Sequence, residues 1–391
     1  MKITNVQTIS LSFLLDKPVY DANYEMATKP CLLVQVSTDE GISGMGESAH
    51  FGGPLVTLKT VIEEELKPNI LGEDPLNTER IWEIMHKRSY KHGRGGILIS
   101  AMSGIDIALW DIKGKVAGLP LYKLLGGFTN RIMAYATGGF YSEGKRIEGL
   151  IQELELYKRN GFKAVKIKVG RSSTFVPNPL RVMEHRGICE TSPKEDLERI
   201  RAARETLGND ILLMVDANYA WDVPTAIKMG RKMEKYDIYW LEEPVSPDDV
   251  NGSAQVASAL DIPIAGYETC SYGRYSFRDY IEKRAIFFVQ PDIAWSGGIS
   301  ECLKIAHLAN AFDLPVAPHI HGSAVSVAAS LHFMGAIPNA SLAETVFPSH
   351  PLMEELIKNP IKLDRDGFIT LPDSPGLGVD LNPDVVKKYR V

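Results

Sequence analysis

The stretch ILLMVDANYAWDVPTAIKMGRKMEKYDIYWLEEP, residues 211–244, shows the pattern that decides the fold. Two short apolar runs, ILLMVD and DIYWLE, flank a segment with helical spacing. This alternation is typical of a βαβ unit, in which a helix joins two parallel strands. The runs end in Asp216 and Glu242. The unit therefore predicts acidic side chains at the carboxyl edge of a parallel sheet.

The same unit repeats from residue 131 onward. Seven helical stretches separate eight apolar runs, which are IMAYAT, KAVKIKV, ILLMVD, DIYWLE, PIAGYE, AIFFVQPD, LPVAPH and SLAE. Eight parallel strands in strict alternation with helices are better satisfied by a closed barrel than by an open sheet, which stays the alternative at this point.

The rest of the chain has a different pattern of predicted secondary structure. Residues 1–125 mix strand and helix patterns and are expected to form a small α+β unit, in which apolar spacing from Ile99 predicts a helix that stops at Gly118. Residues 126–350 hold the repeated units. Residues 351–391 contain no further unit, and we expect them to return to the N-terminal unit.

Composition narrows the class of protein. The 391 residues are 45% hydrophobic and 24% charged, with a formal net charge of −6, which is ordinary for a globular protein. We find no basic tract, no apolar run long enough to cross a bilayer and no secretion signal, and the four cysteines show no CxxC spacing. We therefore expect a cytoplasmic protein without nucleic-acid or membrane partners. An anionic substrate would need local cations.

Three carboxylates predict a metal site. Asp216, Glu242 and Glu268 follow one another at intervals of 26 residues, one βα unit each, so they end adjacent strands and face the same rim. Three convergent carboxylates stay ionised together only beside a cation. Oxygen ligands without cysteine or histidine favour Mg²⁺ or Mn²⁺ over Zn²⁺. The alternative is that each carboxylate merely forms a salt bridge.

Two lysines on one strand predict a base. Lys166 and Lys168 are two residues apart, hence on one face of a strand, and point into the barrel mouth. Their mutual repulsion and a nearby metal are expected to lower the pKa of at least one of them toward the range of a general base. The alternative is a pair of surface lysines, which the apolar neighbours disfavour.

A histidine and two acids complete the predicted site. Asp292 and His319 end successive strands, and an aspartate beside a histidine fixes the imidazole tautomer and raises its basicity. A structural histidine is the alternative, and His321 is a rival. Glu344 follows on the last strand and, if protonated, could donate a hydrogen bond to a developing enolate. Its alternative is a solvated acid.

These groups suit one reaction. The proton α to a carboxylate is very weakly acidic, so its removal at neutral pH requires preorganised positive charge that stabilises the enediolate. The metal and Lys166 would supply that charge. A base, a metal and an acid are all predicted.

The sequence resembles the mandelate racemase group of the enolase superfamily. The motifs, in order, are GIDIALWDIKGKVAGLPLYKLLGG, KIKVG, DAN, LEEP, AGYET, QPDIAWSGGIS, APH and PGLGV. The resemblance implies a (β/α)7β modified TIM barrel with an α+β capping domain, which accounts for eight strands and seven helices. It also implies a symmetric homo-oligomer.

The same resemblance implies roles for single residues. It makes Asp216, Glu242 and Glu268 the Mg²⁺ ligands, with Glu242 rather than its neighbour Glu243. Lys168 becomes the acid/base of the second strand. The remaining roles are Lys166 for steering the substrate carboxylate, the pair Asp292 and His319 as a dyad, Glu344 for enolate stabilisation, and Asn218 for a further polar contact.

One departure from the family spacing lies after the second strand. Lys168 and Asp216 are 48 residues apart, and the excess falls in a polar insertion at 171–193. It is placed to act as a lid or a subunit contact, or it is a tolerated surface loop. The candidates there for binding a distal anionic group are Arg171, Arg181, His185 and Arg186.

Specificity is expected from the capping domain, whose loops near Val19–Lys29 and at residues 50–53 would close over the barrel mouth. The candidate contacts are Tyr20, Tyr24, His50, Lys91, His92 and Arg94. We expect an acid-sugar dehydratase that forms a 2-keto-3-deoxy acid. The alternatives are a racemase or epimerase, a sugar-acid lactone cycloisomerase, or a non-catalytic protein that binds sugar acids.

Overall fold

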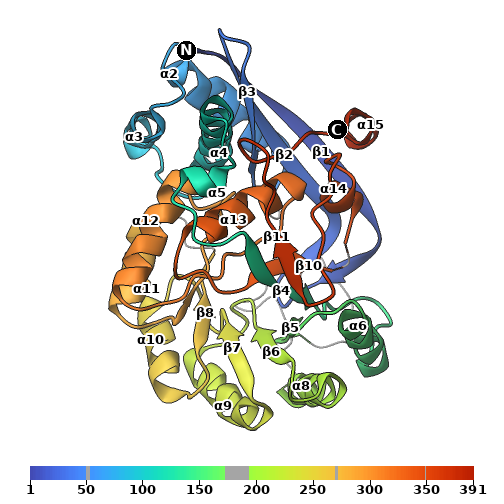
Figure 1. Ribbon diagram of the computed structural model, residues 1–391. Coiled ribbons are helices and arrows are strands. Elements are labelled where there is room, and N and C mark those ends of the chain that lie inside the picture. Colours follow the sequence, from blue (N-terminus) through green and yellow to red (C-terminus); the bar gives the residue numbers. More distant parts are fainter. Residues whose placement is uncertain (50–52, 172–192, 269–271, 348) are drawn as a thin grey trace.

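The computed structural model describes residues 1–49, 53–171, 193–268, 272–347 and 349–391. An antiparallel sheet and a curled parallel sheet form its two parts (Figure 1). The antiparallel sheet consists of β1 (Ile3–Tyr20), β2 (Glu25–Thr38) and β3 (Ser43–Ser48). With the helices that follow it, this sheet forms the cap.

The parallel strands are β4 (Arg131–Gly138), β5 (Ala164–Lys168), β6 (Leu212–Asp216), β7 (Ile238–Glu242), β8 (Ile264–Gly266), β9 (Phe288–Val289) and β10 (Ala343–Val346). They are hydrogen-bonded in the order β10, β4, β5, β6, β7, β8, β9. The run LPVAPH, predicted as a strand, forms only isolated bridges at Val316, to Val289 on one side and Ala340 on the other. Pro315 and Pro318, within this run, lack the N–H that a longer ladder needs. These bridges still close the ring, which confirms the predicted barrel.

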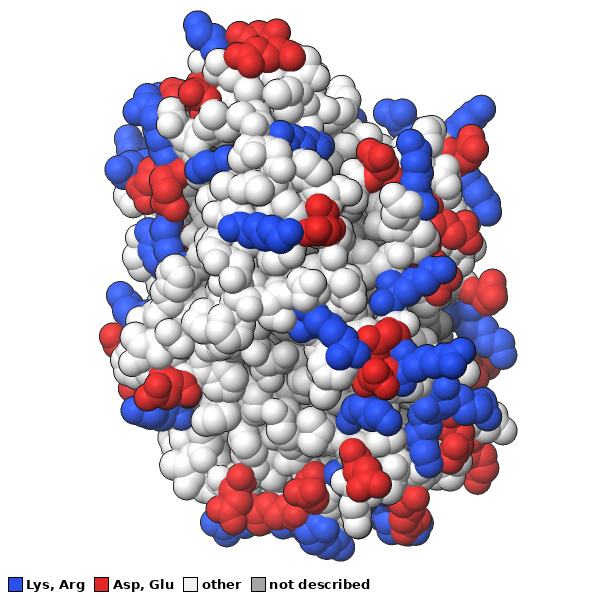
Figure 2. Space-filling view, in the orientation of Figure 1, with Lys and Arg blue, Asp and Glu red and all other residues white. Residues whose placement is uncertain are grey.

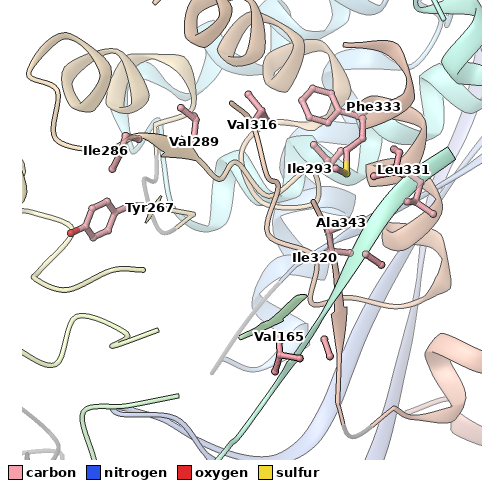
Figure 3. Close-up of a cluster of buried hydrophobic side chains, with 14 of the residues drawn as sticks. Val165, Tyr267, Ile286, Val289, Ile293, Val316, Ile320, Leu331, Phe333 and Ala343 are labelled. Carbon is pink, nitrogen blue, oxygen red and sulfur yellow. The ribbon is translucent and has the colours of Figure 1, made fainter. Parts of the chain in front are cut away.

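Seven helices of the described chain follow the strands. They are α6 (Ile147–Arg159), α8 (Pro193–Leu207), α9 (Val223–Met233), α10 (Val250–Ala259), α11 (Arg274–Glu282), α12 (Gly298–Ala311) and α13 (Ala324–Ala336), and a 3₁₀ turn, η3 (Glu234–Tyr236), follows α9. Figure 1 shows them around the outside of the sheet. The outward side chains of the strands pack against these helices. Figure 3 shows members of that core, among them Val165, Val289 and Val316.

The inward side chains form a separate apolar cluster. Each strand position contributes one residue to it, and the members are Tyr135, Ala164, Met214, Trp240, Ala265, Phe288, Ala317 and Leu342. Alternate residues of a strand face the same side, so residues two positions further along also point inward. Those residues include Lys166, Asp216, Glu242, His319 and Glu344. An apolar plug therefore fills the barrel, and the charged residues lie directly above it.

The cap sheet is covered on both faces. Leu32 and Val34 of β2 pack into a cap core with the long helix α4 (Ile97–Ala117), while Cys31 and Leu33 belong to the core shared with the barrel. The other cap helices are α1 (Leu55–Thr60), a π-helix η1 (Val61–Leu66), α2 (Lys67–Ile70), α3 (Thr78–Arg88), a 3₁₀ turn η2 (Ser89–Lys91) and α5 (Leu121–Leu124). Helix α4 ends at Gly118, whose positive φ of 65° suits glycine. Period-two alternation thus assigns the buried apolar side chains of β2 alternately to two cores.

Residues 351–391 contact both parts of the molecule. They contain α14 (Pro351–Glu354), β11 (Phe368–Thr370) and α15 (Pro383–Tyr389). Strand β11 pairs antiparallel with β4 of the barrel, and the Val391 N–H donates to the Ser10 carbonyl of the cap sheet. Figure 1 shows α15 beside β1.

Two buried carboxylates of the cap bind the N-termini of barrel helices. Asp106 of α4 accepts hydrogen bonds from the Ser300 N–H at 2.9 Å and the Ser300 hydroxyl at 2.6 Å, in the first turn of α12. Glu47 of β3 accepts from the Ser323 N–H at 2.9 Å and the Ser326 N–H at 3.0 Å, at the start of α13. Each side chain caps a helix of the other part of the chain.

Charged side chains of both signs are mixed on one face of the molecule. On the face shown in Figure 2, Lys and Arg lie among Asp and Glu around the edge, and the middle carries few charges. No helix in the described ranges combines the length and apolar character needed to cross a bilayer.

We predict that Asp106→Ala lowers the thermal midpoint Tm by roughly 2–6 °C, because the first turn of α12 loses its cap, worth about 1–2 kcal/mol. Tm is measured by circular dichroism. Asp16→Ala, an exposed residue of β1, is the control and should leave Tm unchanged. An equal loss in both variants would contradict the capping role.

Asp106→Asn adds a pH test. Burial raises the pKa of Asp106 to about 7, against the lowering effect of its Ser300 hydrogen bonds. Between about pH 4 and 7 the folded protein therefore holds a proton that the unfolded chain has lost, and wild-type stability falls as pH rises. The asparagine side chain does not titrate, so the stability of this variant does not fall over the same pH range. Its Tm relative to wild type should increase from pH 5 to 7.

Candidate active site

The carboxyl ends of the barrel strands open into a cavity of about 680 Å³, which residues of the barrel and of the cap line together. From the barrel come Phe140, Lys168, Asn218, Glu268, His319 and His321, and from the cap Asp21, Tyr24, Lys29 and Cys31. Three of the predicted strand-end residues, Lys168, Glu268 and His319, thus line one opening.

Lys166 is the central cation beneath this cavity. Its Nζ lies 2.5 Å from Glu242 Oε1, 3.0 Å from Glu344 Oε1 and 3.9 Å from Asp216 Oδ2. Burial alone would lower the pKa of Lys166, but the carboxylates, above all Glu242, outweigh it and raise that pKa well above its usual value. One ammonium group therefore lies among three buried carboxylates, of which Asp216 is also paired with Lys168.

Lys168 lies next to Asp216, with its Nζ hydrogen-bonded to Asp216 Oδ2. Burial is the largest influence and lowers the pKa of Lys168, but the charges of Asp216, Glu242 and Asp21 together outweigh burial and the repulsion from Lys166, so the pKa is raised. The expectation of a lowered lysine pKa is wrong for this arrangement. Repulsion between the two ammonium groups is the weaker effect because each has a carboxylate in direct contact.

Glu242 and Glu243 occupy different surroundings. Glu242 faces inward like Trp240, and its Oε2 accepts hydrogen bonds from Trp240 Nε1 at 2.9 Å and Gln290 Nε2 at 3.0 Å. Glu243 lies just beyond β7, and burial, followed by the charge of Glu268, raises its pKa well above the usual range. Glu242 is therefore the member of the pair that belongs to the inward layer.

Glu268 follows β8 and faces His319 across the site, with 3.9 Å between Glu268 Oε1 and His319 Nε2. Within the described chain, its Oε2 atom is buried without a hydrogen-bond partner. Asn218, after β6, also lines the cavity, and its N–H donates to Asp216 Oδ1 at 2.8 Å. Its Oδ1 is buried and unsatisfied by the described residues. Buried oxygens of this kind usually have a partner, so both point to a ligand that completes the site.

His319 and Asp292 form the predicted dyad geometry. His319 Nδ1 lies 2.7 Å from Asp292 Oδ2, which leaves Nε2 directed toward Glu268. Burial would lower the pKa of His319, but Glu268, Glu344 and Asp292 raise it to about 9. The His321 ring stacks on His319 at 5.7 Å between centroids. His319 is thus the histidine that contacts the buried carboxylates, and its rival His321 stacks beside it.

Glu344 does not meet the condition attached to its predicted role. Its oxygens accept hydrogen bonds from the Thr137 hydroxyl at 2.5 Å and the Ile320 N–H at 2.9 Å, beside the Lys166 ammonium. Burial raises its pKa, but Lys166 and the other partners outweigh burial and lower it to about 2. The expected protonated donor is therefore an ionised acceptor in this arrangement. Its carboxylate holds Lys166 in place.

The proposed metal ligands have suitable chemistry but are not gathered around one point. Asp216, Glu242 and Glu268 offer only carboxylate oxygens, which Mg²⁺ prefers. No group of three or more Asp, Glu, His or Cys side chains in the described ranges stands ready to hold a metal ion, because Asp216 and Glu242 face lysines. Glu268 Oε2, which has no hydrogen-bond partner among the described residues, is an oxygen that could coordinate a cation. In chemical type, the three carboxylates fit a hard cation.

Several other predicted contacts do not line this cavity. Tyr20 instead pairs with Tyr141, and the guanidinium carbon of Arg171 lies 4.7 Å from its ring centroid. Lys91, His92 and Arg94 are exposed elsewhere on the cap, where His92 binds Glu65 at 2.5 Å. His50, Arg181, His185 and Arg186 lie outside the described residues.

Sequence reasoning missed four residues near the site. Thr137 and Gln290 bind Glu344 and Glu242, and both follow the inward parity of Tyr135 and Phe288, a signal that was available. Lys29 and His350 line the cavity from outside the repeated units. Lys29 shares the parity of Cys31 and Leu33, so strand periodicity could have placed it on the barrel side of β2. His350 carries no such signal.

The arrangement can move protons on both sides of a bound anion. Lys168 and His319 line the same cavity from different strands, and each is held by a buried carboxylate. Lys166, buried beside Glu242 and Glu344, adds a positive charge that would attract a substrate carboxylate. Such a site can remove a proton from carbon and return one elsewhere.

Two family models match the chain. One, described as the mandelate racemase / muconate lactonizing enzyme N-terminal domain, covers residues 3–126. The other, described as enolase C-terminal domain-like, covers residues 149–385.

Similar proteins cover most of the chain. An arabinonate dehydratase of Saccharolobus solfataricus is 38% identical over 356 residues, which are 91% of this chain and 89% of the relative. A D-galactarolactone cycloisomerase of Agrobacterium fabrum is 34% identical over 401 residues, or 100% and 99% of the two chains. A crystal structure of a racemase from Streptomyces coelicolor A3(2) with bound magnesium matches with a TM-score of 0.87 and 30% identity, covering 100% of both chains.

We predict that Lys166→Met lowers the Tm of chelator-treated protein by at least about 5 °C. Removing one partner of a buried ion pair costs about 3–5 kcal/mol, and Lys166 serves several carboxylates. Lys17→Met, which removes an exposed cap lysine, is the charge-matched control and should leave Tm unchanged. An unaltered Tm for Lys166→Met would mean that the carboxylates do not depend on this ammonium group.

Proposed function

The chain belongs to the mandelate racemase / muconate lactonizing enzyme family of the enolase superfamily, as its motifs predicted, and we propose that it dehydrates an acid sugar. It is an enzyme, a lyase or an isomerase. The reaction begins with removal of the proton α to the carboxylate and ends in a 2-keto-3-deoxy acid. The observation that carries the proposal is that Lys168 and His319 line one cavity above a layer of buried carboxylates.

Asp216, Glu242 and Glu268 would hold Mg²⁺. When bound, the ion supplies positive charge that stabilises the enediolate. Lys166 adds a fixed positive charge directly below, and Glu344, hydrogen-bonded to Thr137, keeps that charge in position. Ionised Glu344 accepts rather than donates, so its proposed part in enolate stabilisation runs through Lys166. Asn218 has an unsatisfied Oδ1 among the described residues and would accept from a substrate hydroxyl.

Lys168 or His319, in its neutral form, removes the α-proton. Each is placed to act on one face of the substrate, since they approach the cavity from β5 and from the strand position of Val316. The choice between them depends on the configuration at the α-carbon. Asp292 fixes the His319 tautomer through Nδ1, so that Nε2 is the atom that takes or gives a proton.

The second step expels the β-hydroxyl. The electron pair left by the α-proton forms the double bond to the β-carbon, and the bond from that carbon to its hydroxyl oxygen breaks. Protonated His319 donates from Nε2 to this oxygen, so the leaving group is water. The enol product takes up a proton at the β-carbon and becomes the 2-keto-3-deoxy acid. No oxidant or reductant is needed.

Two rival reactions share the first step. If the opposite acid/base group returns a proton to the α-carbon, the result is racemisation or epimerisation. The similarity to a D-galactarolactone cycloisomerase over the full chain supports a sugar-acid lactone cycloisomerisation as the other rival. We further propose, from family membership, a homo-oligomer in the cytoplasm.

We predict that Lys168→Ala and His319→Asn each lower dehydration of the best substrate by roughly 10²–10⁴-fold, the usual contribution of a general acid or base. Production of 2-keto acid is measured across a panel of acid sugars. In D₂O, one variant should retain α-proton exchange on one substrate stereoisomer. Full turnover in either variant would remove that residue from the mechanism.

The same panel tests the alternatives. Deuterium incorporation with an inverted α-carbon and no 2-keto acid would indicate an epimerase, and a ring-opened product from a lactone would indicate a cycloisomerase. Wild-type protein with Mg²⁺ that exchanges no α-proton in any acid sugar would contradict the proposed function.

We predict that a chelator abolishes turnover and that added Mg²⁺ restores it. Glu268→Gln should weaken Mn²⁺ binding, measured by electron paramagnetic resonance, at least tenfold, because a carboxylate ligand is lost. Glu242→Gln should act likewise. Glu243→Gln is the matched control with the same chemical change one residue away, and it should weaken binding much less. Equal losses for the last two variants would contradict the assignment of Glu242.

A further inference from the structure

Among the residues that the structure describes, Lys29 is a buried cation without an acidic partner in contact. It lies on β2 of the cap, is 4% exposed and lines the cavity. No carboxylate oxygen of the described residues is within ion-pair distance of its Nζ; its polar neighbour is His321 Nε2, at 3.4 Å. The other buried lysines behave differently, since Lys166 and Lys168 contact carboxylates.

The burial of Lys29 away from any carboxylate of the described residues requires an explanation. Lysine is almost never fully buried unless it is paired, because an unpaired ammonium group loses its hydration. Burial, followed by the charge of Lys168, lowers the pKa of Lys29 to about 8, while Asp21 opposes the shift. At pH 7, Lys29 therefore still carries its proton, and its positive charge, in most molecules. The missing partner is a negative charge that the described chain does not supply at contact distance.

Two histidines border the same place. Burial, and then the Lys29 charge, lowers the pKa of His321 well below its usual value, so that its ring is neutral and Nε2 accepts from Lys29. His350 also lines the cavity and is 5% exposed, yet its Nδ1 has no hydrogen-bond partner among the described residues. Burial lowers its pKa to about 3. These neutral rings leave Lys29 as the positive charge of this end of the cavity.

The distance to the reacting groups suits a small substrate. The Nζ atoms of Lys29 and Lys168 lie 5.9 and 5.2 Å from the centroid of the Phe140 ring. One substrate chain can therefore reach both ammonium groups. One end would lie at Lys168 and the carboxylate layer, and the other would lie against the cap.

We propose that Lys29, with His321 and His350 beside it, binds a second carboxylate at the far end of the substrate, so that the preferred substrates are dicarboxylic acid sugars. This inference rests on the proposed function, because it assigns the orientation of the same substrate. It places the reacting carboxylate in the barrel and the distal carboxylate on the cap. A monocarboxylic sugar with a terminal hydroxyl would leave the buried charge unpaired.

The test compares a diacid and a monoacid sugar of matching configuration on the Mg²⁺-loaded enzyme. Wild type should show the higher kcat/KM for the diacid. Lys29→Met should lower the diacid-to-monoacid ratio by roughly 10- to 100-fold, the range expected for a charge-assisted hydrogen bond. Lys29→Arg should keep most of the preference. Lys17→Met changes net charge equally on the exposed cap surface and should leave the ratio unchanged.

Binding is measured in parallel by the ligand-induced shift of Tm, with a 6-phosphorylated monoacid as a further ligand. A wild type that turns over monoacids as well as diacids, or a Lys29→Met variant with an unchanged ratio, would overturn the inference and leave the proposed function standing. Preference for the phosphorylated monoacid would overturn the choice of carboxylate. Diacid binding that depends on Lys29 without any turnover would support the subsite and contradict the proposed function.

Discussion

The ion pairs of Lys166 are the constraint on which the site depends. One buried ammonium group contacts Glu242 and Glu344 and lies within 3.9 Å of Asp216, directly above an apolar plug that excludes water. Charges in such surroundings persist only as a balanced set. The period of two creates the set, because in most of the barrel strands an inward polar side chain lies two residues after an inward apolar one. Strand β8 is the exception, since Glu268 lies three residues after Ala265. Fold and chemistry therefore share one pattern.

The cap is joined to the barrel by the same kind of interaction. Asp106 and Glu47 place buried carboxylates on the N-termini of α12 and α13, where unpaired N–H groups and the helix dipole favour negative charge. Helix α13 begins shortly after His319 and His321. Glu47 thus fixes the cap sheet to the segment that carries the imidazoles, and this contact determines where Lys29 on β2 meets the cavity.

The sequence was sufficient for the barrel because its signal is repeated. Regular spacing predicted which residues end the strands, and motif order predicted the family. Interactions that depend on three dimensions were not predictable. Repulsion between Lys166 and Lys168 suggested a lowered pKa, whereas contact with carboxylates raises it. Glu344 was expected to be protonated, whereas Lys166 keeps it ionised. Sequence spacing gives the position of a charge, but only its neighbours give its protonation state.

The barrel groups and Lys29 differ in their contacts, and this difference separates the chemistry of the site from its substrate preference. The barrel groups are bound to one another so tightly that a change in any one alters the charge of the rest, which restrains their variation. Lys29 differs because its carboxylate partner is missing from the described chain, so replacing it disturbs no internal ion pair. A cap residue of this kind can change while the proton-transfer groups stay fixed. Preference for the far end of the substrate can therefore vary independently of the chemistry at the near end, because the two ends are held by different parts of the chain.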